Sequence, residues 1–227
     1  MLSGRTTLVG LIGNPVEHSL SPAMHNAAFA ARGLDWAYVP LLVEDGRVED
    51  AVRGLVALGF AGANVTAPHK AAAAAACETE LGSVNVLVVR DGRVQGLSTD
   101  AAILDGLPAE RPVILGSGGA AGAFRAALPG ARVFSRRGDW PPDAAGADVV
   151  INATSERDAV LCVLSEGQTL IDLPYPETAT GRAARETGAT VVGGLDVLVA
   201  QGVASFELWT GVAAPVEVMR AAVGLAR

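Results

Sequence analysis

The sequence predicts an α/β fold of two lobes with a cleft between them. Short apolar runs of strand type alternate with helical segments along the chain, an order typical of parallel sheets covered by helices. The alternation is interrupted near residues 101–110, where a short segment leads to Pro108. A glycine-rich turn then follows a strand and opens a helix. We therefore expect one lobe before the interruption and a second lobe after it.

The first lobe is expected to begin with a buried strand over residues 6–13, an apolar run that ends in glycine. Ser21 before Pro22 predicts an N-cap and a first helical position, followed by a helix over 22–32. Within 83–100, Asp91-Gly92 predicts the turn of a hairpin. The other expected elements are strands over 36–43 and 61–66, a helix over 45–58 and an alanine-rich helix from Lys70.

The second lobe shows the same alternation in shorter segments. A helix is expected over 101–107, and 111–128 reads as strand, glycine turn and helix. A turn and a short helix are expected over 138–147. The remaining expected elements are strands over 131–137, 148–155, 168–175 and 189–194, and helices over 178–187, 195–208 and 214–226.

Composition indicates an acidic globular protein with an aliphatic core. Half of the 227 residues are hydrophobic, 4% are aromatic, and the net charge is −7. This charge argues against nucleic acid as a partner, because phosphate binding needs clustered cations. The N-terminus lacks a signal-peptide pattern and no apolar stretch reaches about 18 residues, so we expect a cytoplasmic protein without a membrane partner. Cys77 and Cys162 predict free thiols, and the spacing of the histidines and cysteines predicts no metal site.

The glycine-rich turn predicts a dinucleotide site in the second lobe. Glycines permit a tight turn and close approach of the backbone to a pyrophosphate, and the helix N-terminus supplies free N–H groups. The second lobe is therefore expected to be Rossmann-like. The alternative is a purely structural turn. The residues concerned are Gly116, Ser117, Gly118, Gly119 and Ala120.

The end of the next strand favours NADP over NAD. An NAD site usually has an acidic residue there that binds the ribose hydroxyl. This strand ends instead at Ser135, Arg136 and Arg137, and the first carboxylate is Asp139. Two arginines suit a 2′-phosphate, because guanidinium groups form charge-assisted hydrogen bonds with phosphate oxygens. The alternative is that both arginines are merely solvated.

Eight motifs follow one another along the chain: GNPVEHSLSPAMHNAAF, GANVTAPHK, VNV, GLSTD, LGSGGAAGA, INATS, DLPYPETAT and LVAQGVASFELWTG. With these motifs in this order, the chain resembles the shikimate dehydrogenase family. That resemblance implies NADP-dependent reversible reduction of 3-dehydroshikimate to shikimate, a step of aromatic amino-acid biosynthesis. It also implies a substrate-binding lobe over 1–101, joined by C-terminal helices at about 203–227, and an NADP-binding lobe over 102–202.

The resemblance also implies roles for individual residues. Ser19 and Ser21 are expected to bind the substrate carboxylate, and Asn64 is either a pocket residue or a backbone brace. The expected ring contacts are Thr66, Asn85, Asp100, Tyr175 and Gln201, and further cofactor contacts are expected at Asn152, Ala153, Thr154, Leu173 and Gly194.

Lys70 and Asp100 match the catalytic pair of that family. A hydride that reaches a ketone carbon leaves an alkoxide, which must gain a proton as it forms. An ammonium group can donate that proton, and a neighbouring carboxylate can orient it. Lys70 is thus expected to be the proton donor and acceptor, held by Asp100. The alternative is a solvated lysine on an alanine-rich helix.

Several departures from the family keep other functions open. Val86 and Ser98 replace polar residues common in the family, the stretch between Ser135 and Asn152 is short, and Glu156-Arg157 stand where glycine is common. The chain therefore reads as a short member of the family. The alternatives are a dehydrogenase for quinate, aminoshikimate or a related ring polyol, with NADP or NAD, and an inactive ligand-binding regulator. The expected partner is a small-molecule substrate, with the protein a monomer or a homodimer.

Overall fold

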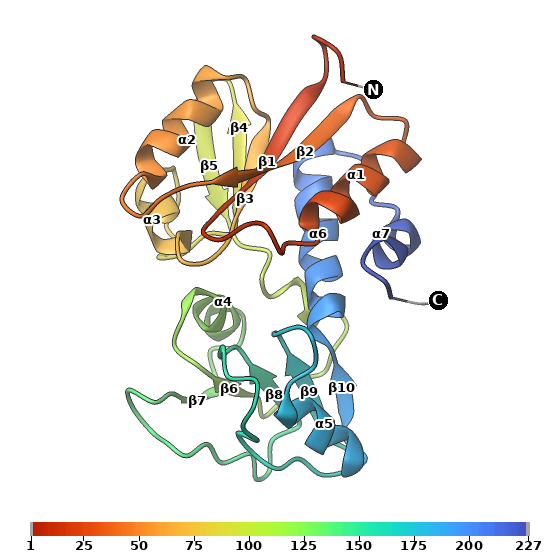
Figure 1. Cartoon of the computed structure of the whole chain (residues 1–227). Coiled ribbons are helices and arrows are strands. Elements are labelled where there is room, and N and C mark those ends of the chain that lie inside the picture. The colour runs from red at the N-terminus through yellow and green to blue at the C-terminus, as the bar shows by residue number, and fades with distance from the viewer. Residues whose placement is uncertain (1, 226–227) are drawn as a thin grey trace. The chain divides into compact units, whose positions relative to one another are not determined.

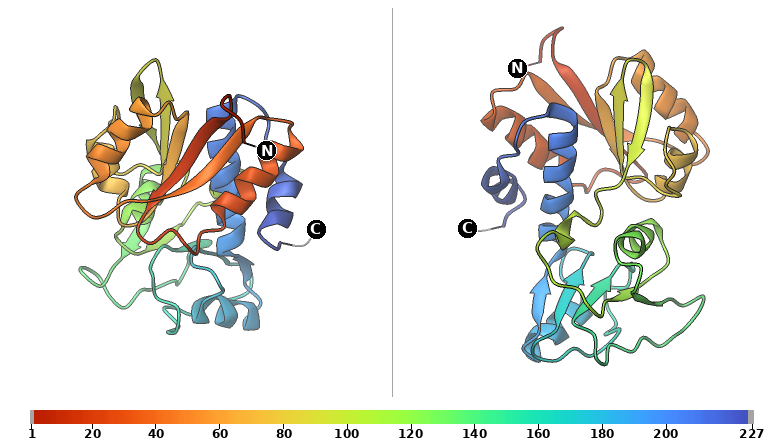
Figure 2. Two further views of the ribbon diagram at one scale, coloured as in Figure 1. Left: turned by 45° about the horizontal axis from the view of Figure 1, so that its top comes forward. Right: turned by 180° about the vertical axis from the view of Figure 1, so that it is seen from behind.

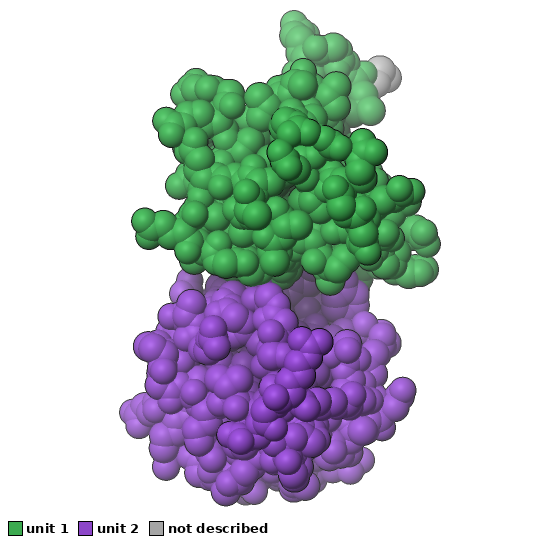
Figure 3. Space-filling model, turned by 90° about the vertical axis from the view of Figure 1, so that its left-hand side faces the viewer, with its two compact units in different colours: residues 1–99, 199–227 green, residues 100–198 purple. Residues whose placement is uncertain are grey.

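The structure, a computed structural model, describes residues 2–225, which form two compact units (Figures 1 and 3). Unit 1 comprises Met1–Thr99 and Val199–Arg227, and unit 2 comprises Asp100–Leu198. The sequence places these boundaries at 101/102 and 202/203, a few residues later. The predicted ends of the last helix, at 226, and of the C-terminal segment, at 227, lie outside the described residues.

Unit 1 is built on a five-stranded mixed sheet. Its strand order is β2-β1-β3-β4-β5. The β2–β1 and β1–β3 pairs are parallel, and the β3–β4 and β4–β5 pairs are antiparallel. Asp91 and Gly92 have φ angles of 51° and 74° between β4 and β5, which confirms the predicted hairpin turn. The strands are β1 (Thr7–Gly13), β2 (Trp36–Leu42), β3 (Gly62–Val65), β4 (Val86–Arg90) and β5 (Arg93–Leu97).

Helices cover both faces of this sheet. On one face, α2 (Val48–Ala57) and α3 (Lys70–Ala75) close a core of aliphatic side chains. The other face packs against α1 (Ser21–Ala31) and the unit 1 part of α6 (Gly194–Thr210), and α7 (Val216–Ala222) packs against α1 on the side away from the sheet (Figure 2). Side chains alternate between these faces because successive residues of a strand point to opposite sides.

Unit 2 is built on a five-stranded sheet in which every pair is parallel, as the alternating pattern predicts. Its order is β10-β9-β8-β6-β7. Buried aliphatic clusters fill both faces of the sheet, one of them including residues of α4 and α6. The elements are β6 (Val113–Leu115), α4 (Gly119–Ala127), β7 (Arg132–Phe134), β8 (Val149–Asn152), β9 (Thr169–Asp172), α5 (Ala179–Glu186) and β10 (Thr190–Val192).

Three local predictions are wrong. The first helix begins at Ser21 itself, with Leu20 in the N-cap position and no side-chain cap, so Ser21 is not the N-cap. The helix predicted over 101–107 is only a 3₁₀ turn, Ala102–Leu104, because Gly106 adopts a φ of 80° just beyond it. No helix forms over 138–147, where the two prolines at 141–142 lack N–H donors.

Candidate active site

A buried polar network surrounds Asn64 on β3. Ala63 and Val65 point into the aliphatic core beneath α2 and α3, so Asn64 faces the other side of the sheet. The Tyr38 hydroxyl donates to Asn64 Oδ1 at 2.9 Å, and Asn64 Nδ2 donates to the Asn85 carbonyl at 3.1 Å and to Ser205 Oγ at 2.9 Å. The amide is thus engaged by three protein groups. Of the two interpretations of Asn64, these bonds fit the brace.

Asn85 connects the sheet to the loop that precedes Asp100. Its Oδ1 accepts the backbone N–H of Thr99 at 2.7 Å, and its Nδ2 donates to Gln201 Oε1 on α6 at 3.0 Å. The Thr99 hydroxyl in turn donates to the Gln201 carbonyl at 3.2 Å. Asp100 is the next residue and is 9% exposed. The network therefore fixes the backbone immediately before the predicted catalytic carboxylate.

Lys70 is the first residue of α3 and the only lysine in the chain. Two contacts hold this corner. The buried ring of His69 donates from Nε2 to the Val43 carbonyl at 2.7 Å, and the Lys70 carbonyl accepts the Val84 N–H at 3.1 Å. His69 therefore braces the start of α3, and the Lys70 backbone is tied to the segment that leads into β4.

The residues predicted to bind the substrate carboxylate and ring are divided between the units. Asp100 and Tyr175 belong to unit 2, and the others, Ser19, Ser21, Thr66, Asn85 and Gln201, belong to unit 1. Ser21 is buried, and its backbone N–H donates to Ser19 Oγ at 3.2 Å. Thr66 directly follows β3 and donates from its N–H to the Ile12 carbonyl at 2.9 Å. A Cβ at Gly13 would lie 2.4 Å from the Thr66 methyl, so Gly13 makes room for Thr66.

His25 is buried in an aromatic cluster behind this network. Its ring stacks on Tyr38 with centroids 4.6 Å apart and contacts Trp209 at 5.4 Å. Neither ring nitrogen has a hydrogen-bond partner among the described residues, and burial lowers the pKa of His25 to about 3. Burial also raises the pKa of the Tyr38 phenol, only partly opposed by a hydrogen bond with Ser21. The cluster is therefore neutral at physiological pH.

In unit 2 the glycine turn has the backbone expected of a nucleotide site. Gly116 adopts a φ of 120°, and a Cβ there would lie 2.9 Å from the Ala153 carbonyl. Gly118 is extended, and a Cβ added to it would meet no atom within 4 Å, so the space beside it is open. No side chain caps α4, which leaves its first N–H groups available to an anion. Ser117 is exposed, and Gly119 and Ala120 form the first turn of α4.

The other predicted cofactor residues lie at the end of β8, in the loops after β8 and β9, and at the start of α6. Asn152 is fully buried: its Nδ2 donates to Asp172 at 2.8 Å, and its Oδ1 accepts the Thr154 hydroxyl at 2.7 Å. It therefore braces the loop in which Ala153 lies against Gly116. Gly194 begins α6, where a Cβ would lie 2.4 Å from the Leu173 carbonyl. Tyr175 is half-buried, and burial raises its pKa.

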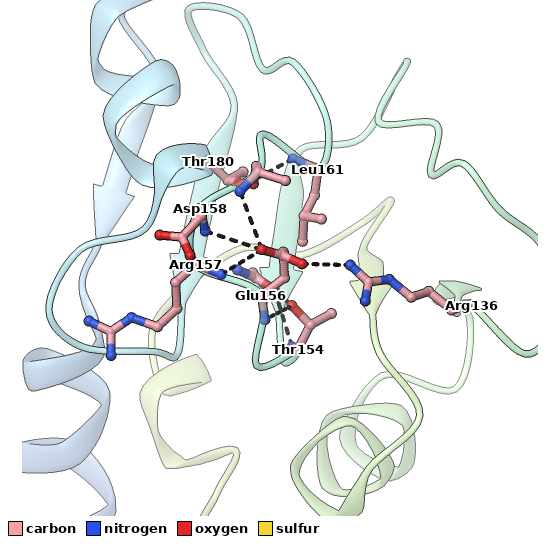
Figure 4. Close-up of polar contacts among 9 residues, drawn as sticks. Arg136, Thr154, Glu156, Arg157, Asp158, Leu161 and Thr180 are labelled. Atoms are coloured by element: carbon pink, nitrogen blue, oxygen red, sulfur yellow. Dashed lines mark hydrogen bonds and ion pairs between the residues drawn. The ribbon is translucent and has the colours of Figure 1, made fainter.

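Arg136 forms an ion pair with Glu156, as Figure 4 shows. Its guanidinium donates to Glu156 Oε2 at 2.6 Å and also lies over the Trp140 ring, 5.8 Å from the centroid. The Arg136 hydrogen bond, with those of the backbone N–H groups after Glu156, holds the pKa of Glu156 below its usual range. Arg137 and Ser135 lie beside Arg136, with Arg137 exposed.

Sequence reasoning missed Tyr38, Thr99 and Ser205 as members of the network around Asn64 and Asn85. Ser205 lies 141 residues from Asn64 in the sequence, and no local pattern predicts their contact. Lys70, which was predicted, carries a second signal in the sequence: it is the only lysine of the chain, and arginine stands at all the other Lys/Arg positions. Among the described residues, no cluster of three or more His, Cys, Asp or Glu side chains could hold a metal. Nor is any described helix long and apolar enough to cross a membrane.

Comparison with known proteins identifies the relatives of this chain. Residues 11–87 match the shikimate dehydrogenase substrate-binding domain, and residues 194–223 match the shikimate 5′-dehydrogenase C-terminal domain. Shikimate dehydrogenase (NADP⁺) from Anaeromyxobacter sp. (strain Fw109-5) is 40% identical, with 98% of both chains covered.

Solved structures agree with this sequence match. The shikimate dehydrogenase of Aquifex aeolicus is 29% identical and superposes with a TM-score of 0.90 over 99% of this chain and 100% of that one. The enzyme of Thermus thermophilus, solved in complex with NADP(H) and shikimate, is 29% identical with a TM-score of 0.83, over 95% and 98% of the two chains. The chain belongs to the shikimate dehydrogenase family.

Proposed function

We propose that this protein catalyses the NADP-dependent, reversible reduction of 3-dehydroshikimate to shikimate. The observation that carries the proposal is the network of Asn85, the residue before β4. Direct hydrogen bonds join it to Thr99, the residue before Asp100, and to Gln201 of α6. In this proposal unit 1 binds the substrate and unit 2 binds NADP. We place the enzyme in the cytoplasm, in keeping with its two free cysteines, as a monomer or homodimer.

Substrate recognition is assigned to hydroxyl and amide groups of unit 1. Ser19 and Ser21 are assigned to the substrate carboxylate, and Thr66, Asn85 and Gln201 to the ring hydroxyls. Because Gln201 Oε1 already accepts from Asn85, its Nε2 is the group left to donate outwards; no described residue accepts from it. A polyol has many oxygens that can accept such bonds, which fits this arrangement.

NADP fits the glycine turn and the arginines of unit 2. The open space beside Gly118 and the uncapped start of α4 suit a pyrophosphate, and Arg136 and Arg137 suit the 2′-phosphate. Asn152 is assigned to hold the Ala153–Thr154 backbone against the glycine turn. Leu173, just after β9, and Gly194, at the start of α6, are assigned as further cofactor contacts. When bound, NADPH supplies the hydride that reduces the substrate carbonyl.

Lys70 is assigned to supply the proton. Reduction of a ketone adds one hydride to carbon and one proton to oxygen, and the Lys70 ammonium donates that proton. In the oxidation direction the amine takes the hydroxyl proton back. Asp100, held by the Thr99–Asn85 bonds, is assigned to orient the amine. His69 and Val84 keep the Lys70 backbone in place while its side chain works.

A steady-state assay with two substrates and two cofactors tests the activity. Shikimate and quinate are each oxidised with NADP⁺ and with NAD⁺, and the reduced cofactor is followed by absorbance. The proposal predicts the highest kcat/KM for shikimate with NADP⁺. Higher kcat/KM for quinate would replace the substrate assignment, and saturable shikimate binding without turnover would indicate a regulator instead.

A further inference from the structure

The end of β7 has no carboxylate, but the fold of unit 2 places the carboxylate of Glu156 against Arg136 there. The sequence favours NADP because Ser135, Arg136 and Arg137 stand where an NAD enzyme has an acid. In the folded unit, however, Glu156 comes from the loop after β8 and pairs with Arg136 at 2.6 Å. Arg136, the arginine assigned to the 2′-phosphate, therefore pairs with a carboxylate that lies 20 residues further along the chain.

Several contacts fix that carboxylate in place. Its Oε1 accepts the backbone N–H groups of Arg157, Asp158 and Ala159 at 3.1–3.3 Å, while Oε2 accepts from Arg136 (Figure 4). The N–H of Glu156 itself donates to the Thr154 hydroxyl at 3.2 Å. The Glu156 side chain is only 24% exposed, against 66% for Arg136. The acid is thus the better anchored partner of this pair.

We propose that Glu156 is a cofactor-specificity residue, whose carboxylate engages Arg136 and narrows the preference of this site for NADP over NAD. The proposal rests on the function proposed above, in which Arg136 binds the 2′-phosphate. A phosphate dianion that reaches Arg136 must share it with the Glu156 carboxylate, and the two anions repel. The ribose hydroxyl of NAD carries no charge and can donate a hydrogen bond to a carboxylate. One residue therefore penalises NADP and leaves NAD unaffected or favoured.

Equilibrium binding tests this proposal without relying on turnover. Dissociation constants for NADP⁺ and NAD⁺ are measured by calorimetry for the wild type, Glu156→Gln and Asp158→Asn. Glutamine keeps the size of Glu156 and a side-chain oxygen that can accept the backbone N–H groups, but it removes the charge. Asp158 is the matched control, since it is an exposed acid two residues away whose carboxylate is not bonded to Arg136. Circular dichroism melts check folding, and Glu156→Ala gives a second reading if the glutamine variant is unfolded.

Glu156→Gln is expected to bind NADP⁺ at least about fivefold more tightly, with NAD⁺ binding unchanged or weaker. Asp158→Asn is expected to change the ratio of the two constants by less than about twofold. An unchanged or lowered NADP⁺ preference in Glu156→Gln overturns the proposal. Arg136→Gln tests the assignment of Arg136 to the 2′-phosphate separately from the specificity role of Glu156. If that variant binds NADP⁺ as the wild type does, the assignment of Arg136 to the phosphate fails, whatever Glu156 does.

Discussion

Asn85 and Gln201 lie 116 residues apart in the sequence and are joined by a hydrogen bond of 3.0 Å from Asn85 Nδ2 to Gln201 Oε1. This bond orients the Gln201 amide, because only its oxygen can accept and its nitrogen must then point elsewhere. Gln201 therefore presents a hydrogen-bond donor. Since Asn85 also holds the Thr99 backbone, one side chain positions groups on two separate segments.

Gln201→Glu should convert that donor into an acceptor. The carboxylate can still accept from Asn85, so the fold should be retained, but it presents an anion where the substrate hydroxyl expects a donor. The KM for shikimate should rise roughly 10- to 100-fold, the effect of leaving polar groups mismatched in a site. Initial-rate kinetics check this, with Gln201→Ala as the variant that removes the donor without adding charge. An unchanged KM in both variants would contradict the role assigned to Gln201.

Ser205→Ala should lower the free energy of unfolding by about 1–2 kcal/mol, because Asn64 Nδ2 loses one of its two buried acceptors. Thr210→Ala is the matched control on the same helix. Both hydroxyls donate at 2.8 Å to the carbonyl four residues earlier, but Thr210 accepts the Val212 N–H at 3.1 Å instead of a bond from Asn64. Denaturant unfolding measures both, and a Ser205→Ala variant as stable as the wild type would contradict a contribution from the bond to Asn64.

The stability of the protein should fall as the pH decreases from about 6.5 towards 3. His25 has its pKa lowered to about 3 by burial, so between these values the unfolded chain binds a proton that the folded chain does not. The free energy of unfolding from this group should therefore fall by about 1.4 kcal/mol per pH unit below pH 6. In His25→Phe this part of the slope should disappear. His18→Gln, at an 89% exposed side chain, should leave it intact.

Alanine at two glycines of the nucleotide turn should separate folding from cofactor binding. Gly118→Ala meets no atom within 4 Å and keeps an allowed backbone, so its melting temperature should match the wild type while its affinity for NADP⁺ falls. Gly116→Ala should lose about 1–3 kcal/mol of stability, because its φ is 120° and its Cβ would press on the Ala153 carbonyl. Gly118→Ala with wild-type NADP⁺ affinity would remove the turn from the cofactor site.

The sequence predicts the regular elements well because strand and helix periods and glycine stops are local signals. The wrong predictions come from competing local chemistry. The hydroxyl of Ser21 is not used as a cap, and prolines at 141–142 prevent a helix in a segment that otherwise reads as one. The Asn64–Ser205 contact in unit 1 and the Arg136–Glu156 contact in unit 2 could not be foreseen, because each depends on which distant segments the fold of its own unit brings together. Asp100 and the glycine turn could be proposed as site residues from the sequence because each lies within a short motif.

The turnover of Lys70→Ala tests the central claim most directly. Lys70 is the only lysine in the chain, so no other lysine can replace its amine. Shikimate oxidation with NADP⁺ should lose at least about 100-fold in kcat, while the melting temperature and the dissociation constant for NADP⁺ stay close to those of the wild type. A folded Lys70→Ala variant with near-normal kcat would contradict the assignment of Lys70 as the proton donor and acceptor.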